Sequence, residues 1–238
     1  ETIHSLGLDM PDAARIAAIL RRNGSDPAKI KSELAEAHTA LDAVSRYAEA
    51  KEGLFIQRRS VPEAVFLSDA TVEQAKAESE RICALLRDLS RLENEENRLE
   101  SRRAGLLPWK ELDLPLEESG SACTSFRLEV CPAGVNLEEA RAALEDTAAD
   151  VLEISADKQQ LYTLLISHRA EEEQAQERLR PFNFSVTSFQ DFTGTAAENI
   201  AALDRQLEEN RAAQEEVTKQ LRESGGSRDA LRLYADRL

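Results

Sequence analysis

The stretch Gly105-Leu-Leu-Pro-Trp-Lys-Glu-Leu-Asp-Leu-Pro-Leu-Glu117 interrupts a long charged helical pattern and contains the only tryptophan among the 238 residues. Its two prolines cannot lie inside a regular helix, because proline lacks an amide hydrogen and its ring clashes with the preceding turn. We therefore expect Gly105 and Pro108 to end a helix there. We expect Trp109 and Leu112 to pack at a joint between that helix and the domain that follows.

The residues before this stretch predict one long helix. Apolar side chains recur three and four positions apart, at Ile82, Leu85, Leu89, Leu92 and Leu99. A helix from Thr71 to Gly105 would be about 52 Å long at 1.5 Å per residue. This is too long for the interior of a small domain, so the helix needs a partner along its length.

The expected partner begins after Gly194. One heptad phase holds the apolar residues Ile200, Leu203, Leu207, Val217, Leu221, Leu231, Ala235 and Leu238, with the polar residues Asn210, Gln214, Ser224 and Arg228 at the remaining seam positions. The phase continues across Gly225-Gly226, which predicts a kink or a short break after which the helix resumes on the same face. Two seams around one insert predict an antiparallel hairpin; the alternative is two unrelated amphipathic helices on a globular core.

The insert at 106–194 changes from a helical to an alternating period. Its patterns predict, in chain order, a strand at 125–130, a helix at 136–148, strands at 151–155 and 160–167, a helix at 171–180 and a strand at 184–189. This βαββαβ order is the split βαβ arrangement, a two-layer lobe in which two helices cover one face of a sheet. We expect the other face to be left for a partner or for solvent.

The first 67 residues indicate an incomplete second lobe, with helices at 12–22 and 26–53 and short edge strands at 54–56 and 64–67. The expected organisation is a partial, mostly helical lobe at 1–67, an outgoing helix at 68–105, an α/β lobe at 106–194 and a returning helix at 195–238. The fold class is therefore α+β and helix-dominated. We expect an elongated dumbbell in which a coiled-coil-like hairpin carries the βαββαβ lobe at one end and the incomplete lobe at the other.

The charge of the chain restricts its partners. The formal net charge is −15, and residues 107–194 hold seven Lys/Arg against 17 Asp/Glu, a net of −10. Such a surface repels phosphate backbones and anionic lipid head groups, so we expect no nucleic acid and a protein partner with basic patches. Because no apolar run approaches the roughly 20 residues that span a bilayer, we expect no direct membrane contact by this piece of chain.

No set of residues indicates catalysis. His4, His38 and His168 are dispersed, phosphate-binding glycine loops are absent, and Cys83, Cys123 and Cys131 have neither disulfide nor zinc spacing. We expect no catalytic residue, no cofactor and no metal, with reduced thiols and with His168 as an exposed strand end. The four phenylalanines Phe182, Phe184, Phe189 and Phe192 are expected in the core rather than in a ligand site.

A candidate partner contact is the acidic run Glu171-Glu172-Glu173, together with Arg178. The alternative is that these acids begin a helix, where the positive end of the helix dipole favours carboxylates. At a helix start the acids need only lie in the first turn, whereas in a partner contact their side chains must be exposed.

With these residues in view, the chain resembles the cytoplasmic N-terminal domain of subunit I (subunit a) of V-type and A-type rotary ATPases. The resemblance lies in a long charged helix, then Leu107-Pro-Trp-Lys-Glu-Leu-Asp113, then a βαββαβ lobe with Phe182 and Phe184 before its last strand, then a second long helix. It covers 68–238 well and 1–67 loosely.

The resemblance implies a non-catalytic stator subunit on the cytoplasmic face of a membrane complex, which supports the coupling of ATP hydrolysis or synthesis to proton or sodium transport. In that family a distal lobe, here 106–194, grips the helical heterodimer of the peripheral stalk, and a proximal lobe, here part of 1–67, lies near the membrane. The family's C-terminal membrane domain would be a further partner. Because the chain starts without Met and stops inside a helical pattern, we expect an excised piece.

Two other classes of protein share parts of this pattern. A coiled-coil hinge or scaffold protein of the chromosome-organising type also carries a globular insert between two helical arms, but the acidic insert argues against a DNA-binding hinge. An enzyme carried on the lobe would need a polar pocket that holds His168 with a carboxylate, since the βαββαβ fold by itself does not imply an activity.

Overall fold

The computed structural model describes residues 26–48 and 69–238. The helix expected at 12–22 and the strands expected at 54–56 and 64–67 lie outside the described residues. The helix expected at 26–53 ends earlier, at Tyr47, because the chain is already extended at Ala48. The chain divides into two compact units, Glu1–Glu93 with Ala212–Leu238 and Asn94–Arg211, which we describe separately.

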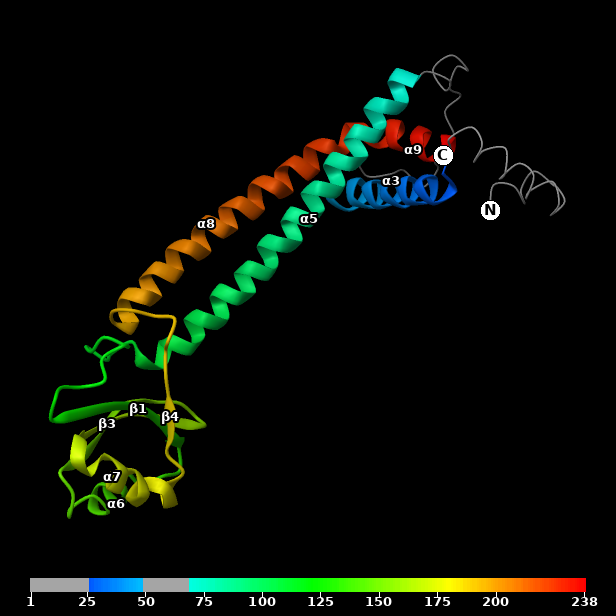
Figure 1. Cartoon of the computed structure of the whole chain (residues 1–238). Helices are drawn as coiled ribbons and strands as arrows, with labels where there is room; N and C mark the ends of the chain where they lie inside the picture. Colours follow the sequence, from blue (N-terminus) through cyan, green and yellow to red (C-terminus); the bar gives the residue numbers. More distant parts are fainter. Residues whose placement is uncertain (1–25, 49–68) are drawn as a thin grey trace, which may run out of the picture. The chain divides into compact units, whose positions relative to one another are not determined.

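Two long helices dominate the described residues, in agreement with the expected α+β, helix-dominated class (Figure 1). Helix α5 is Asp69–Leu106 and helix α8 is Ala196–Glu223. The expectation that Gly105 ends α5 is wrong, because the helix continues through it. A methyl group at this position would meet no atom within 4 Å, so no close contact requires a glycine here. The helix ends one residue later, where Leu107–Trp109 form the 3₁₀ turn η1 with Pro108 in its first positions.

The first unit contains helix α3, Pro27–Tyr47, the first part of α5, the end of α8 and helix α9, Arg228–Arg237. Asp26 caps α3 by accepting a hydrogen bond from the Ala28 amide, and Pro27 occupies the first helical turn, where its missing amide hydrogen costs nothing. A buried cluster joins all four helices through Ala40, Ala43, Val44, Ile82, Cys83, Leu89, Leu221 and Leu231.

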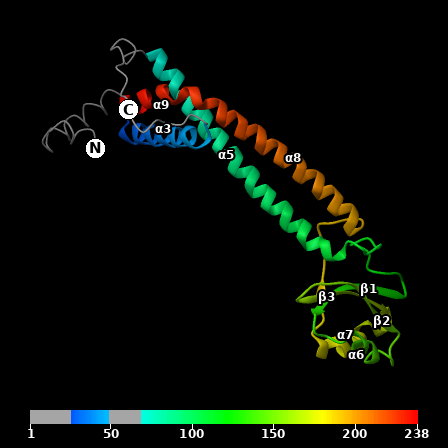
Figure 2. The same cartoon turned by 180° about the vertical axis from the view of Figure 1, so that it is seen from behind.

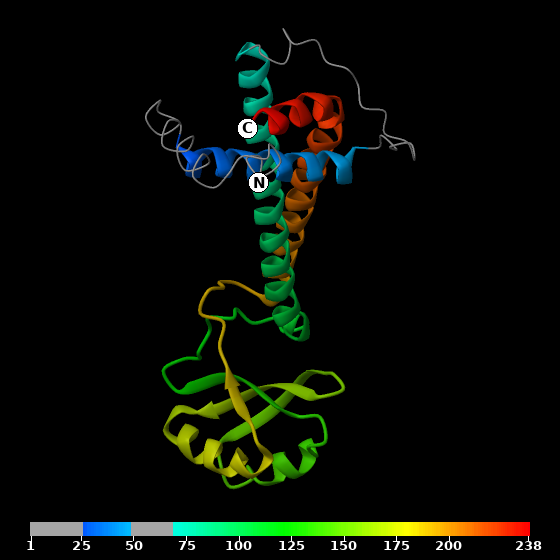
Figure 3. The ribbon, with the colours of Figure 1, turned by 90° about the vertical axis from the view of Figure 1, so that its right-hand side faces the viewer.

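Ion pairs also join the helices of the first unit. Lys76 Nζ lies 2.8 Å from Glu33 of α3, and Arg237 of α9 lies 2.7 Å from Asp69 at the start of α5. The second pair brings the beginning of α5 to the end of α9. Figure 3 shows α3 crossing α5 in this unit.

A four-residue 3₁₀ turn, η4, separates α8 from α9 at Ser224–Ser227. This is the break that Gly225-Gly226 predicts in the heptad pattern. A Cβ atom on Gly225 would lie 3.0 Å from the Cβ of Ala48, whereas Gly226 has open space around it. A side chain at the first glycine would therefore press against the residue that follows α3.

The second unit contains the βαββαβ lobe in the expected order. Its elements are β1 Thr124–Pro132, α6 Leu137–Ala142, β2 Ala149–Ala156, β3 Gln160–His168, α7 Glu172–Leu179 and β4 Ser185–Thr187. The strands form one antiparallel sheet in the order β2-β3-β1-β4. Helices α6 and α7 cover one face, where Ala140, Leu144, Val151, Leu165, Ala175 and Leu179 form a buried cluster (Figure 2).

Two elements of the lobe are shorter than expected. Helix α6 ends at Ala142 rather than Ala148, because the amides of Leu144 and Thr147 bond to carbonyls three residues back, which tightens the chain into turns. Strand β4 ends at Thr187 rather than Phe189, because the chain leaves the sheet there and Phe189 packs against Trp109 instead.

We expect the two glycines of η4 to differ in their tolerance of alanine. Gly225→Ala should lower the thermal midpoint, because its methyl group meets Ala48, which must shift. Gly226→Ala should hold or raise the midpoint, since alanine is favoured over glycine in helical conformations by about 1 kcal/mol. Thermal unfolding by circular dichroism of the two variants side by side measures this, and equal midpoints would contradict the packing role of Gly225.

Candidate functional site: the joint between the helices and the lobe

The stretch after α5 is folded onto the uncovered face of the sheet. Pro108 and Trp109 form η1, and the Trp109 side chain is 1% exposed. Its ring meets those of Tyr162 on β3 and Phe189 after β4 edge-to-face, with centroids 5.5 and 5.8 Å away. Such aromatic pairs contribute about 0.5–1.5 kcal/mol each beyond the area that they bury.

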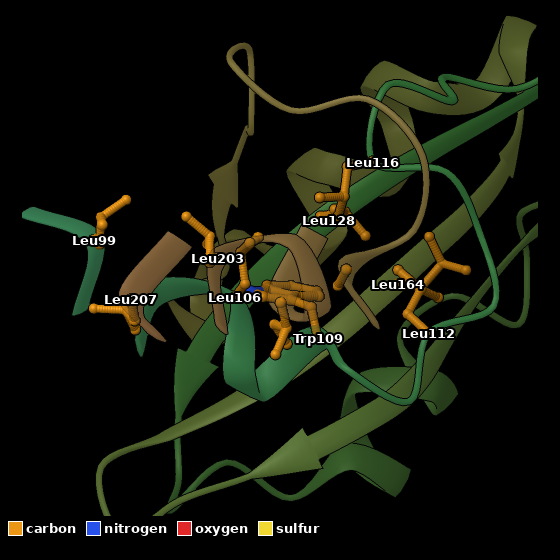
Figure 4. Packing of buried hydrophobic residues seen from close by; sticks show 11 residues of the cluster. Leu99, Leu106, Trp109, Leu112, Leu116, Leu128, Leu164, Leu203 and Leu207 are labelled. Carbon is orange, nitrogen blue, oxygen red and sulfur yellow. The ribbon is translucent and has the colours of Figure 1, made fainter. Parts of the chain in front are cut away.

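One buried cluster, which we call the joint cluster, connects the helices to the lobe. Its buried members are Leu99, Leu106, Trp109, Leu112, Leu116, Leu128, Leu164, Ala196, Ile200, Leu203 and Leu207 (Figure 4). Side chains on the second face of the sheet, including Phe126, Val130 and Ile166, pack against it. The expectation that this face is left for a partner or for solvent is therefore wrong, because the chain's own joint covers it.

Hydrogen bonds fix the two connections between helices and lobe. The Ser155 hydroxyl of β2 donates to the Pro108 carbonyl at 2.6 Å. The Leu116 amide donates to the Gly194 carbonyl at 2.9 Å, and the Gly194 amide donates to the Glu117 carboxylate at 2.8 Å. Gly194 has φ of 80°, a conformation that favours glycine. The outgoing and returning chains are thus tied to each other as well as to the sheet.

Within the same unit, charged residues join the end of α5 to the start of α8. Arg103 Nε lies 2.5 Å from Asp204, and Arg211 lies 2.6 Å from Glu96 and 2.7 Å from Glu100. Later residues of α8 thus meet earlier residues of α5, so these two helices are antiparallel. Glu100, Arg103, Asp204 and Arg211 line a hollow of about 420 Å³ between them, whose walls carry both signs of charge.

The structure brings together the three expected joint residues, Pro108, Trp109 and Leu112, and places the acidic run elsewhere. Pro108 contacts β2 through its carbonyl, and Trp109 and Leu112 are buried in the joint cluster. The cluster also recruits Tyr162 and Phe189, whose distance along the chain gave no indication that they meet Trp109.

The acidic run lies at the start of α7, on the other side of the sheet. Glu171 accepts a hydrogen bond from the Ala148 amide at 2.7 Å, and Glu172 forms an ion pair with Arg127 of β1. Glu173 is exposed, and Arg178 lies 4.0 Å from Asp146. Glu172 and Glu173 occupy the first turn of α7, in agreement with the helix-start interpretation.

The four phenylalanines belong to the core, as expected, but to two clusters on opposite faces of the sheet. Phe182 and Phe184 pack against the cluster under α6 and α7, whereas Phe189 and Phe192 pack against the joint cluster. Arg102 of α5 lies over the Phe192 ring, 4.6 Å from its centroid. The short strand β4 therefore carries the chain from one face to the other.

The residues weighed for chemistry have structural surroundings. His168 is exposed at the end of β3, as expected, and its Nδ1 accepts a hydrogen bond from the Ala170 amide. Cys83, Cys123 and Cys131 are free thiols. Among residues 26–48 and 69–238, no three His, Cys, Asp or Glu side chains are grouped to hold a metal ion. In the same ranges no helix is long and apolar enough to cross a bilayer.

Sequence reasoning missed a buried acid in the lobe. Glu129, in the middle of β1, is 3% exposed, and its Oε2 has no hydrogen-bond partner within the described part of the chain. Burial raises the pKa of Glu129 from 4.5 to about 7, against the opposing attraction of Arg127. Since Phe126, Leu128 and Val130 share one face, strand alternation places Glu129 on the face that the two helices cover.

The chain was compared with protein families, curated proteins and solved structures. No protein-family model and no curated protein matches the chain. It is similar to a crystal structure of the cytoplasmic N-terminal domain of subunit I, homolog of subunit a, of V-ATPase. The TM-score is 0.49 at 19% sequence identity, over 96% of this chain and 71% of that chain.

We expect Trp109→Ala to destabilise the joint without unfolding the helices. Removing a buried tryptophan leaves a cavity and costs about 3–5 kcal/mol. The far-UV circular dichroism of the native state should be nearly unchanged, while urea denaturation shifts to lower concentration. Leu107→Ala, at the neighbouring exposed position, is the control and should cost less than about 1 kcal/mol. A large loss of native helix signal in Trp109→Ala would contradict this assignment.

Glu129 should make the lobe less stable as the pH rises. A carboxyl whose pKa is raised on folding favours the folded state below pH 4.5, and this contribution is lost as the pH rises through about 7. The shift from 4.5 to about 7 corresponds to a loss of up to about 3 kcal/mol. Glu129→Gln should therefore be more stable than the parent at pH 8 and similar to it at pH 4.5. Urea denaturation at both pH values measures the difference, and a constant difference would contradict it.

Proposed function

We propose that this chain is the cytoplasmic, non-catalytic stator part of a subunit of a rotary V-type or A-type ATPase. In this role it links peripheral-stalk subunits to the ion-translocating membrane sector, and so supports the coupling of ATP hydrolysis or synthesis to proton or sodium transport. The observation that carries the proposal is the joint, in which the family-like stretch 107–113 seats two antiparallel helices on a βαββαβ lobe. The family's own C-terminal membrane domain would be its second partner.

The joint suits a part that must resist torque. A stator holds the catalytic head still against a turning rotor, so a lobe that grips the head must not swivel on the helices that hold it. Swivelling here would break the Ser155–Pro108 and Leu116–Gly194 hydrogen bonds and expose Trp109. Because all three must fail together, the connection behaves as a fixed corner and not as a flexible linker.

The surface of the lobe favours a partner recognised by charge. Among the described residues, only Leu107, Leu152 and Val186 are large apolar side chains with more than a third of their surface exposed. The net charge of −10 over 107–194 would instead attract a basic surface. We propose that this surface is the helical heterodimer of the peripheral stalk.

The three acids of the acidic run differ in whether they are bound within the lobe. Glu171 and Glu172 hold Ala148 and Arg127, so they contribute to the lobe's own structure as well as to its charge. Glu173 and Glu177 are exposed on the outer side of α7, with Arg178 beside them. We propose that Glu173 and Glu177 contact the stalk most directly, and that Arg178 sets the register by pairing with an acid of the partner.

The experiment measures binding of the chain to the purified stalk heterodimer. Glu173→Lys with Glu177→Lys should weaken binding by at least tenfold at 0.1 M salt, and 0.5 M salt should weaken binding of the parent chain, since surface charges are screened. The control variant is Glu111→Lys with Asp191→Lys, which makes the same change of charge outside α7.

The outcomes separate the two parts of the proposal. If the parent chain does not bind the heterodimer at all, the stator assignment is wrong. If the parent binds and both double variants weaken binding equally, the chain is a stator part but α7 is not its docking face.

A further inference from the structure

The heptad pattern of the returning helix passes through η4 as though the helix did not break. Seam positions at Leu221, Ser224, Arg228, Leu231 and Ala235 keep their three-and-four spacing. The structure nevertheless inserts a 3₁₀ turn, and it buries Tyr234, which lies one residue off that seam. The same sequence is therefore compatible with a second arrangement, in which α8 and α9 form one helix.

Polar contacts from α5 hold the turn. Arg81 donates two hydrogen bonds of 2.8 Å to Glu78, and one of 2.7 Å to the Ser224 hydroxyl. The Ser224 hydroxyl donates a hydrogen bond to the Gln220 carbonyl at 2.9 Å, and the Ser227 hydroxyl donates to Glu78 at 2.8 Å. We call this set of four side chains, Glu78, Arg81, Ser224 and Ser227, the latch. It binds both ends of η4 to one turn of α5.

Apolar packing flanks the turn on both sides. Leu221 before it and Leu231 after it are buried in the core of the first unit. The turn itself reads Ser-Gly-Gly-Ser and supplies no apolar side chain, apart from the approach of Gly225 to Ala48. Mid-helix 3₁₀ segments often mark hinges. Arg81 and Glu78 are 45% and 23% exposed, so water and salt can reach the latch.

Closing the turn places α9 on α3. Tyr234 is buried with Ala37 of α3 and Ala75 of α5, and Ala230, Ala235 and Leu238 pack against them. If α9 left α3, Tyr234 would lose its contacts with Ala37 and become exposed. Tyr234 burial is therefore a marker of the latched state.

We propose that Ser224–Ser227 is a latched hinge with two states, a bent state held by Glu78 and Arg81 and a straight state in which α8 and α9 are one helix. The latch sets the population of the two states, and α9 leaves α3 when it opens. This goes beyond the stator assignment and does not depend on it, because it concerns only contacts within the first unit.

The experiment measures a distance across the turn in the whole chain. Spin labels are placed at Lys219→Cys and Asp236→Cys after the three native cysteines are replaced, and the distance distribution is recorded by double electron–electron resonance. In a continuous helix the two Cα atoms would be about 26 Å apart, and the bend shortens this distance. Arg81→Ala with Ser227→Ala should raise the fraction at the long distance at least threefold.

The control is Arg98→Ala. Arg98 makes the same two-bond pair with Glu95 along α5 as Arg81 makes with Glu78, so it matches the loss of charge and of a helix-surface pair. The parent chain in 1 M salt should shift in the same direction as the latch variant, since screening weakens the charged pair.

Two results would overturn the hinge. One is a latch variant whose distances match those of Arg98→Ala. The other is a broad distribution with no component near the continuous-helix distance, which would mean that the latch only stabilises the first unit. A separate component at the long distance, increased by both the variant and salt, supports it.

Discussion

The second unit depends on the burial of Trp109 between η1 and the second face of the sheet. A four-stranded sheet has two faces, and helices α6 and α7 cover only one of them. The other carries Phe126, Val130 and Tyr162, which would be costly to leave in water. The joint supplies the missing layer with a single large ring and a few leucines. The lobe is therefore completed by the segment that connects it, and cannot be separated from the ends of α5 and α8 without exposing this face.

Polar side chains also serve the fold itself. Acidic residues are abundant, yet several of them are used within the fold: Glu171 binds the Ala148 amide, Glu117 binds Gly194, and Glu172 binds Arg127. Their removal would disturb the lobe before it affected any partner. A high net charge is thus a poor guide to which acids are available for binding, and the exposed side of α7 is a smaller surface than the sequence suggests.

The sequence predicts helices and strands well where one face of the element is buried along its whole length, because burial imposes a regular spacing of apolar residues. The βαββαβ order and the two long helices follow from periods of two and of 3.6 residues, and Trp109 was assigned to the joint because prolines flank it. Two of the failures come from contacts between residues far apart in the chain. Phe189 lies within the strand expected at 184–189 but packs against Trp109, and Glu129 looks like a solvent-facing strand residue until α6 and α7 cover its face. Local patterns cannot report such contacts.

The hydrogen bond between Leu116 and Gly194 bears on how much the lobe can vary in length. It holds the start and the end of the lobe side by side, so the two helices meet the lobe as a closed loop whatever lies within it. The entropy of closing a loop grows only slowly with its length, about 0.6 kcal/mol per doubling. Insertions or deletions in the loops between these two residues would therefore cost little, as long as the sheet face under Trp109 is kept. The loops of the lobe can therefore vary in length while the connection between the two helices stays the same.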